Sequence, residues 1–329
     1  MGQASKAVPA FIAGDWGTTH LRLFLCDAAG NALESLEGPG VAAVASGASD
    51  ASGALARVEF ARQFLTLAQD WTTRFGRLPA LLCGMIGSDI GWMSAPYVEC
   101  PARPGDLLDA CVAVEGAHAH IVPGMRCRNR LGGPDVLRGE ETQILGAMRL
   151  DGALAHGRHL LCLPGTHTKW VQLQDGSVQE FLTAPTGELF ALLRERSVLV
   201  RNEAPAEEFL GSPSFALGIR RVREHPQASL LHLMFESRSR RLVDAQGMDN
   251  AAAFLSGLLI GADVQGALAM FDFSGSVVVI GSATLTRLYE AALSSQGVGS
   301  KGIDGSAAAL AGLAQVHAHF TLRSAQHVA

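Results

Sequence analysis

Apolar and polar positions alternate in two similar stretches of the chain, and each stretch predicts two antiparallel strands joined by a tight turn. Each stretch consists of an apolar strand, a Gly-Thr turn and an alternating strand: Phe11–Gly14, Gly17-Thr18 and Leu21–Cys26 in the first, and Leu160–Leu163, Gly165-Thr166 and Trp170–Gln174 in the second. The two turn glycines are 148 positions apart (165 minus 17), about the length of one small domain. The pattern therefore predicts a duplicated unit, with one copy in each of two lobes.

The segments around these units show the spacings of helices and buried strands. Apolar residues three and four positions apart predict an amphipathic helix at Ala54–Phe75, and the run Ala80–Cys83 predicts a buried strand. A second helix is predicted from about Leu137, and a strand at Ser276–Ile280 precedes a helix at Leu285–Leu293. Strands that alternate with helices over 329 residues predict an α/β protein of two lobes with a cleft between them.

Composition narrows the class of protein. With 48% hydrophobic and 17% charged residues, the chain can bury substantial cores. A formal net charge of −5 and scattered Lys and Arg residues offer no basic surface, so we expect no nucleic-acid partner. The six cysteines form no C-x-x-C pair, which favours reduced apolar side chains over a zinc site. Segment 1–9 lacks the apolar run of a signal peptide, and the run Ala251–Ala262 is too short to span a bilayer, so we expect a cytoplasmic protein without membrane contact.

The two Gly-Thr turns are the first candidates for a functional site. Glycine lets backbone N–H groups approach an anion and threonine adds a hydroxyl donor, so two facing turns could clamp a chain of phosphates. The expected phosphate contacts are Gly17, Thr18 and Thr19 in the first turn, and Gly165, Thr166, Thr168 and Lys169 in the second. Asp15 falls opposite Leu163 (15 plus 148), so only the first turn carries a carboxylate, which could hold hydrated Mg²⁺. An isolated Asp would more often close an Asx turn, but the paired turns favour the metal.

A glycine-rich turn and an aromatic loop predict part of a second pocket. The turn 84–88 follows a buried strand, where ligands usually bind in α/β sheets, and the loop 90–101 concentrates aromatic residues. We assign Gly84, Ser88, Trp92 and Tyr97 to this pocket, although the two aromatic side chains could equally fill a loop core. Gly281 and Ser282 join a strand to a helix N-terminus, which is a plausible site for phosphate or adenosine.

Two adjacent carboxylates, Glu140 and Glu141, lie near a predicted helix N-terminus and follow Arg138. Capping and the helix dipole explain such a pair without any chemistry. Alternatively, one glutamate orients or deprotonates a substrate hydroxyl while Arg138 binds a carboxylate in bidentate fashion. Adjacent helical residues point about 100° apart, so only one of the two can face the cleft.

These motifs resemble those of a known kinase family. The run Asp15–Thr19 resembles the first phosphate motif of the actin, hexokinase and Hsp70 superfamily, Gly165-Thr166 its second, and Val278–Ser282 its adenosine motif. From about residue 11 to 320, an ordered set resembles the 2-dehydro-3-deoxygalactonokinases: Gly84–Ser88, Gly91-Trp92, Ala95–Tyr97, Arg138–Gln143, Leu163–His167, Lys169–Val171, Thr186–Leu189 and Phe254–Leu258. The resemblance implies an actin-like ATPase fold, with two RNase H-like lobes of mixed five-stranded sheets flanked by helices.

The resemblance also implies a reaction, which is transfer of the γ-phosphoryl group of ATP to the C6 hydroxyl of 2-dehydro-3-deoxy-D-galactonate in galactonate catabolism. ATP and Mg²⁺ are then the cofactors, with Asp15 holding the metal through water and Lys169 neutralising developing charge. Either Glu140 or Glu141 would position or deprotonate the hydroxyl. A phosphohydrolase of the same fold, a kinase for the gluconate epimer and a nucleotide-binding regulator without turnover remain alternatives.

We expect the first lobe to comprise residues 1–145, with the sugar-acid pocket, and the second to comprise residues 146–306, with the adenosine site. The C-terminal helical segment 307–329 is rich in Ala and Gly and is predicted to pack at the lobe interface. The expected partners are a small sugar acid and ATP, and the oligomeric state, including a homodimer, is left open.

Overall fold

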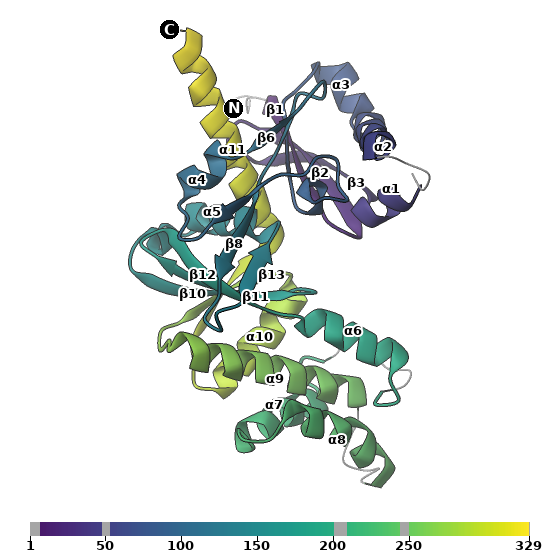
Figure 1. The fold of residues 1–329 in the computed structure, drawn as a ribbon, viewed down its shortest axis with the longest axis vertical. Helices are drawn as coiled ribbons and strands as arrows, with labels where there is room; N and C mark the ends of the chain where they lie inside the picture. Colours follow the sequence, from purple (N-terminus) through teal and green to yellow (C-terminus); the bar gives the residue numbers. More distant parts are fainter. Residues whose placement is uncertain (1–6, 48–52, 201–208, 244–249, 329) are drawn as a thin grey trace, which may run out of the picture.

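Two sheets, one in each lobe, form the framework of the protein. The structure is a computed structural model that describes residues 7–47, 53–200, 209–243 and 250–328; the first part of segment 1–9 therefore lies outside the described residues. Figure 1 shows the first sheet at one end of the long axis and the second sheet near the middle. The strands of the first sheet are β1 (Pro9–Trp16), β2 (His20–Asp27), β3 (Ala32–Pro39), β4 (Ala80–Cys83), β6 (Val112–Val114) and β7 (Ala119–Ile121). The strands of the second are β10 (Arg158–Leu163), β11 (Thr168–Gln174), β12 (Ser177–Ala184), β13 (Val277–Gly281) and β14 (Ser300–Asp304).

The two sheets repeat one topology, which confirms the predicted duplication. Their strand orders are β3-β2-β1-β4-β7-β6 and β12-β11-β10-β13-β14. In both, the first strand of the unit pairs antiparallel with the second and parallel with the fourth. The first sheet has six strands instead of the predicted five, because β6 pairs antiparallel with β7 at the edge. Gly116 (φ 76°) and His118 (φ 51°) adopt left-handed backbone conformations between these two strands, which lets the chain reverse.

A third, three-stranded sheet was not predicted from the sequence. It consists of β5 (Tyr97–Glu99), β8 (Gly124–Arg128) and β9 (Pro134–Leu137), in the order β5-β8-β9. Its residues Met125 and Cys127 pack in one hydrophobic cluster with Phe181 of β12, and the Phe181 N–H donates to Cys127 Sγ at 3.4 Å. This sheet belongs to the segment that we assigned to the first lobe, yet it packs on the second sheet.

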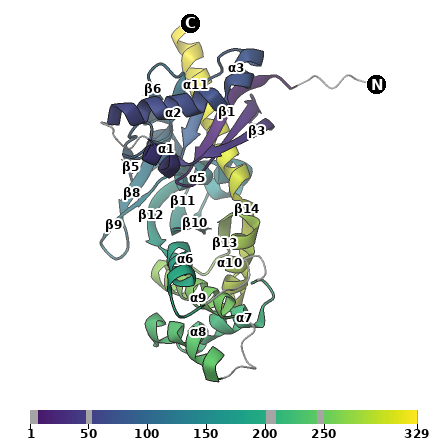
Figure 2. The same ribbon diagram turned by 90° about the vertical axis from the view of Figure 1, so that its right-hand side faces the viewer.

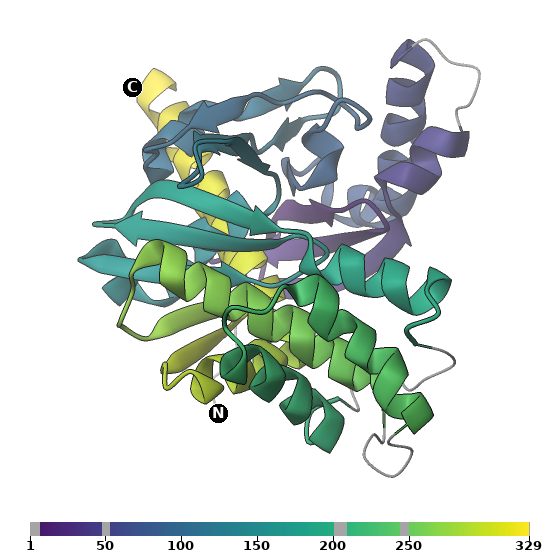
Figure 3. The same cartoon turned by 60° about the horizontal axis from the view of Figure 1, so that its bottom comes forward.

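Helices cover the outer faces of both sheets. In the first lobe α1 (Val41–Gly47), α2 (Gly53–Leu67) and α3 (Gln69–Phe75) pack beside β1–β3, and the single helix predicted at 54–75 is divided at Ala68. In the second lobe the helices are α6 (Thr186–Arg196), α7 (Pro213–Glu224), α8 (Leu230–Val243), α9 (Ala251–Phe271) and α10 (Ala283–Ser295). Figure 3 shows α7, α8 and α9 as a layer at the end remote from the first sheet. The short elements are η1 (Met85–Gly87), α4 (Pro104–Asp109) and η2 (Gly152–Ala155).

Helix α9 corrects one sequence argument. It continues past Asp263 to Phe271 and is 21 residues long, so the apolar run is not too short to span a bilayer. By length and composition it is the one membrane-span candidate among the described residues. However, 61% of its 18-residue apolar stretch is buried inside the protein. Asp263 accepts hydrogen bonds from Trp170, Thr186 and Tyr289 within the fold. These contacts are those of a core helix.

Helices α5 (Glu140–Leu150) and α11 (Gly305–Val328) cross closely between the lobes. Figure 2 shows α11 running from the end of β14, past α5, to the first sheet. A Cβ on Gly146 would lie 1.7 Å from the Ala308 carbonyl oxygen, and one on Gly312 would lie 2.1 Å from the Thr142 carbonyl oxygen. Only glycine permits such close approach of two helix backbones.

Replacing Gly312 by alanine is expected to lower the free energy of unfolding by about 1–3 kcal/mol, because the added methyl group overpacks the crossing. Gly266, in the middle of α9, is the matched control, since a Cβ there meets no atom within 4 Å. Gly266→Ala should stabilise the protein by about 0.5–1 kcal/mol through helix propensity. Chemical denaturation of both variants measures the two changes, and equal effects would contradict the close crossing.

Candidate active site

A large cleft lies between the two sheets and includes both Gly-Thr turns. Its volume of about 620 Å³ lies within the roughly 300–1,000 Å³ of pockets that bind small molecules. The predicted site residues that line it are Asp15, Gly17, Thr18, Gly84, Tyr97, Arg138, Glu140, Gly165, Thr166, Lys169, Gly281 and Ser282. The two turns therefore share one cleft, as the duplicated pattern predicts.

Each Gly-Thr turn is braced by the start of the helix that follows the third strand of its unit. A Cβ on Gly40, before α1, would lie 2.3 Å from the carbonyl carbon of Thr19. A Cβ on Gly187, at the start of α6, would lie 2.4 Å from the carbonyl oxygen of Gly165. Backbone hydrogen bonds from the beginning of each helix to carbonyls of its turn accompany these approaches. Glycine at both positions thus fixes the conformation of the two turns.

Asp15 forms an ion pair that the sequence analysis missed. Its Oδ2 accepts a hydrogen bond from Arg22 Nη2 at 2.7 Å, and the two residues are register partners on β1 and β2. Arg22 Nη1 also donates to Ser306 Oγ at 2.8 Å, at the start of α11. Arg22 lines the cleft beside the carboxylate. This side chain therefore joins the acid of the first turn to the helix that follows the second sheet.

Arg22 and Lys169 occupy matching positions of the two hairpins. Asp15 pairs with Arg22 in the first hairpin, and Leu163 pairs with Lys169 in the second. The second turn is one residue shorter, since 22 minus 15 is 7 and 169 minus 163 is 6. Adding the offset of 148 positions between the two turn glycines to 22 gives Trp170 instead of Lys169, so the offset does not reveal this match. Each hairpin therefore carries one Lys or Arg at this register position, and only in the first is its register partner a carboxylate.

Two predicted phosphate contacts lie outside the cleft wall. Side chains alternate along a strand, so Thr168 points to the face of β11 opposite Lys169, where its Oγ1 lies 2.8 Å from the Tyr289 hydroxyl. The Tyr289 hydroxyl donates its hydrogen to Asp263 at 2.7 Å, so Thr168 must donate to Tyr289 and has no hydrogen left for a phosphate. Thr19 is exposed in the first turn, and its carbonyl accepts the Gly40 N–H.

The two adjacent glutamates lie in different environments at the start of α5. Glu140 lines the cleft, and its Oε2 accepts the backbone N–H of Arg138 at 3.0 Å. Glu141 is fully buried, and its carboxylate accepts hydrogen bonds from the Gly139 N–H at 2.6 Å and from Thr142 Oγ1 at 2.9 Å. Only Glu140 therefore faces the cleft.

Burial shifts the pKa of both glutamates upward. Desolvation raises the pKa of Glu140, although the nearby charge of Lys169 counteracts the shift. Desolvation, with the adjacent Glu140 carboxylate, raises the pKa of Glu141 to about 8. A carboxyl group with such a pKa titrates near neutral pH, where an ordinary glutamate is fully ionised.

The wild-type protein is expected to lose stability as the pH rises from about 4.5 to about 8. Because the pKa of Glu141 is raised from 4.5 to about 8 on folding, the folded state binds more protons in this window, and unfolding becomes easier as they are lost. The slope reaches at most about 1.4 kcal/mol per pH unit. Chemical denaturation of the wild type and of Glu141→Gln at several pH values measures how the free energy of unfolding changes with pH. The stability of the variant relative to the wild type should grow with pH and level off above about 8, whereas a constant difference would contradict the shift.

Arg138 and Tyr97 form a second polar region of the cleft. The Arg138 guanidinium lies over the Tyr97 ring at 4.3 Å from its centroid, and Nη2 donates to the Ala95 carbonyl at 2.8 Å. Its Nε and Nη1 are buried and have no hydrogen-bond partner in the structure. An unpaired buried guanidinium is costly unless a ligand supplies an acceptor. This region therefore suits an anionic or strongly polar ligand.

Two residues predicted for the sugar-acid pocket do not line the cleft. Trp92 is 4% exposed and packs edge-on against Trp16 and tilted against Phe64, in the core beneath β1. It fills a loop core, which was the alternative interpretation of the aromatic cluster. Ser88 is half-buried, and its hydroxyl donates to the Met85 carbonyl at 2.6 Å, which closes the short helical turn η1.

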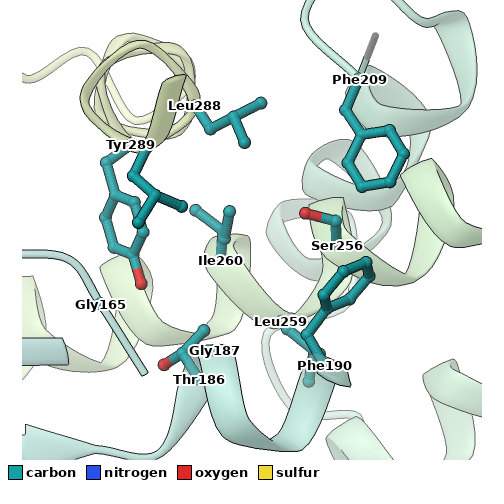
Figure 4. Close-up of a pocket in the computed structure, with 11 residues that line it drawn as sticks. Gly165, Thr186, Gly187, Phe190, Phe209, Ser256, Leu259, Ile260, Leu288 and Tyr289 are labelled. Carbon is teal, nitrogen blue, oxygen red and sulfur yellow. The ribbon is translucent and has the colours of Figure 1, made fainter. Parts of the chain in front are cut away.

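A small apolar cavity of about 60 Å³ adjoins the second turn. Figure 4 shows Phe190, Phe209 and Ser256 on one side of it and Leu288 and Tyr289 on the other. Its remaining lining residues are Gly165, Thr186, Gly187, Leu259, Ile260 and Leu285. Gly165 and Leu285 also line the large cleft, so the two spaces are neighbours.

The groups around Asp15 fit a largely hydrated Mg²⁺. In proteins this ion keeps several waters and uses one or two carboxylates together with substrate phosphates. One oxygen of Asp15 is bound to Arg22, and the other accepts no hydrogen bond from the described residues. No three His, Cys, Asp or Glu side chains in the described segments gather into a metal cage. A metal at this site would therefore be held mainly by water and phosphate.

Comparisons with known proteins place the chain in a family. The model of the 2-keto-3-deoxy-galactonokinase family matches residues 15–316. The chain is 38% identical over 309 residues to a probable 2-dehydro-3-deoxygalactonokinase of Rhizobium meliloti (strain 1021), covering 92% of this chain and 95% of that protein. It is 31% identical over 306 residues to the 2-dehydro-3-deoxygalactonokinase of Escherichia coli (strain K12), covering 93% and 97%.

Solved structures agree on the fold. The crystal structure of a protein from Sinorhizobium meliloti, assigned as a 2-dehydro-3-deoxygalactonokinase, matches with a TM-score of 0.80 and 34% identity, over 94% of this chain and 99% of that one. An activator of 2-hydroxyisocaproyl-CoA dehydratase from Clostridium difficile, with bound ADPNP, matches with a TM-score of 0.53 and 9% identity, over 96% and 97%. The second likeness concerns the two-lobed ATPase fold alone. The chain belongs to the 2-keto-3-deoxy-galactonokinase family.

Proposed function

We propose that the protein transfers the γ-phosphoryl group of ATP to the C6 hydroxyl of 2-dehydro-3-deoxy-D-galactonate. One observation carries this proposal, namely that the two Gly-Thr turns of a duplicated unit line one cleft together with Arg138, Tyr97 and Glu140. The turns suit the triphosphate, and the other side suits an acidic sugar. Membership of the kinase family and the names of both relatives support the same reaction.

The sugar acid would lie on the side of Arg138. Arg138 lines the cleft and its guanidinium lies over the Tyr97 ring, which supports its assignment to the substrate carboxylate. Tyr97 and Gly84 would border the sugar. Glu140 would accept the proton of the attacking hydroxyl, and its raised pKa makes it a stronger base than an ordinary glutamate.

The triphosphate would lie between the turns, with the backbone N–H of Gly165 and the hydroxyls of Thr18 and Thr166 near its oxygens, and Gly17 would let the phosphates approach the first turn closely. Bound Mg²⁺, held by Asp15 through water, would neutralise charge on the transferring phosphates. Lys169 would stabilise the negative charge that develops on the transferred group. Gly281 and Ser282 would border the adenosine, with the base near Leu285, which lines both the cleft and the apolar cavity.

We further propose that the protein acts in the cytoplasm, without a nucleic-acid or membrane partner. The lobe boundaries predicted from the sequence, near residue 145 and residue 306, remain our proposal for the units that close on the ligands, with the three-stranded sheet as an exception. The three-stranded sheet would move with the second lobe, because Met125 and Cys127 share a hydrophobic cluster with Phe181. Closure would exclude water and limit ATP hydrolysis.

The test measures ADP formation and phosphorylated product with ATP and Mg²⁺, in the presence and absence of the sugar acid. The proposal predicts fast turnover only with the sugar acid, one product molecule per ADP, and a phosphate at C6. The gluconate epimer, assayed in parallel, shows which epimer has the higher kcat/KM. Rapid phosphate release that ignores the sugar acid would instead indicate a phosphohydrolase.

A further inference from the structure

Lys169 is an unusual cation because it is almost completely buried beside a polar cleft. It lies on β11, its side chain is 5% exposed, and it lines the cleft. Its charge counteracts the rise in the pKa of Glu140 that burial causes, so the two groups are close in space. Its Nζ donates to Thr183 Oγ1 at 3.0 Å, and no other hydrogen bond of Nζ is found within the described part of the chain. Two N–H groups of the ammonium thus remain for a ligand.

The hydroxyl of Thr183, which accepts from Lys169, is itself held by Asp135. Thr183 Oγ1 donates its single hydrogen to Asp135 Oδ1 at 2.6 Å, so toward Lys169 it is an acceptor. The Thr183 N–H also donates to Asp135 Oδ2 at 2.9 Å. Asn129 Nδ2 donates to the same carboxylate at 3.2 Å, which leaves the Asp135 charge well satisfied. The ammonium, hydroxyl and carboxylate form one oriented chain.

This chain of hydrogen bonds joins two parts of the protein. Lys169 and Thr183 are register partners on β11 and β12 of the second sheet, whereas Asp135 lies on β9 of the three-stranded sheet. Arg138 directly follows β9, three residues after Asp135 (138 minus 135), and Tyr97 lies on β5 of the same sheet. The segment that holds the lysine in place is therefore the one that carries the groups assigned to the sugar acid.

We propose that Thr183 and Asp135 are positioning residues for the phosphoryl transfer, holding the Lys169 ammonium toward the transferred group and linking its orientation to the sugar-acid side of the cleft. This inference rests on the role given to Lys169 in the proposed function. An exposed lysine samples many rotamers, and a single acceptor with a committed hydrogen restricts that sampling. The orientation is then established before the ligands arrive, which is how electrostatic catalysis works.

Thr183→Val removes the acceptor and keeps the shape of the side chain. We expect kcat to fall about tenfold, since the lost bond involves a charged donor, while KM for ATP changes less than about threefold. Thr183→Ser keeps the hydroxyl and should retain at least about half of the wild-type kcat. Thr73→Val is the matched control, because the exposed Thr73 hydroxyl donates to the Gln69 carbonyl on α3, a helix that contributes no residue to the cleft lining. It should leave kcat unchanged.

A double-mutant cycle with Lys169→Met decides whether Thr183 acts through the lysine. Lys169→Met should lower kcat by about 10²–10³-fold, and adding Thr183→Val should then change kcat less than about twofold. Equal factors for Thr183→Val in both backgrounds would overturn the inference and leave the proposed function intact. A wild-type kcat for Lys169→Met would overturn the role of the lysine and the inference with it. Thermal unfolding of each variant, with Thr183→Ser as the folded reference, separates these results from misfolding.

Discussion

Asp15→Asn is expected to lower kcat by about 10²–10³-fold while the protein stays folded. The substitution keeps the size of the side chain but removes the carboxylate beside the first phosphate turn. Two effects then combine, since Mg²⁺ would lose the charged anchor that we propose for it and Arg22 loses its charged partner at 2.7 Å. The Asp15 side chain is 23% exposed and Arg22 is 41% exposed, so solvent can accommodate the unpaired arginine and the fold should persist.

A matched ion pair elsewhere in the chain provides the control. Asp70 pairs with Arg74 at the same 2.7 Å, but on the exposed helix α3. Asp70→Asn should leave kcat unchanged and alter the free energy of unfolding by less than about 1 kcal/mol. The measurements are kcat at saturating Mg²⁺ and ATP and the thermal midpoint of both variants. A folded Asp15→Asn protein with normal turnover would refute the metal role of this carboxylate.

Glu140→Gln is expected to lower kcat by about 10²–10⁴-fold, with smaller changes in both KM values. Glutamine still accepts the Arg138 N–H, so the start of α5 should keep its structure, but it cannot take a proton from the sugar hydroxyl. Burial raises the pKa of Glu140, and the base must be deprotonated to act, so wild-type kcat/KM should rise with pH through a pKa above that of a free glutamate. This limb of the pH profile should vanish in the variant.

The comparison with Glu141→Gln is the sharper part of this experiment. Glu141 is buried among backbone and hydroxyl donors and has no access to the cleft, so its substitution should cost less than about tenfold in kcat. It should change stability with pH instead. Similar losses of kcat in both variants would show that the two glutamates act as one unit, and a larger loss for Glu141→Gln would reverse the assignment.

The sequence predicted the features that repeat. Strand alternation and the Gly-Thr turns appear twice with nearly the same spacing, and the structure places both turns in one cleft. The matched cations were missed because the second turn is one residue shorter, so that Lys169 aligns with Arg22 only when the strands are paired in register. Register depends on contacts between distant residues, and spacing along one chain does not contain it.

Other misassignments have local physical causes. Thr168 was assigned to phosphate because of its position next to the turn, although strand alternation places it on the same face as the core residue Trp170. Trp92 lies in a loop, and its burial depends on Trp16 and Phe64 from other elements. The three-stranded sheet was missed because its strands have only three to five residues, too few for a clear period.

The most direct test of the two-turn cleft is a crystal structure with a non-hydrolysable ATP analogue, Mg²⁺ and the sugar acid. The account predicts the triphosphate between Gly17-Thr18 and Gly165-Thr166, the metal near Asp15, and the sugar carboxylate at Arg138 with its C6 hydroxyl near Glu140. A triphosphate that contacts only one of the two turns, or a sugar acid bound away from Arg138 and Glu140, would contradict it.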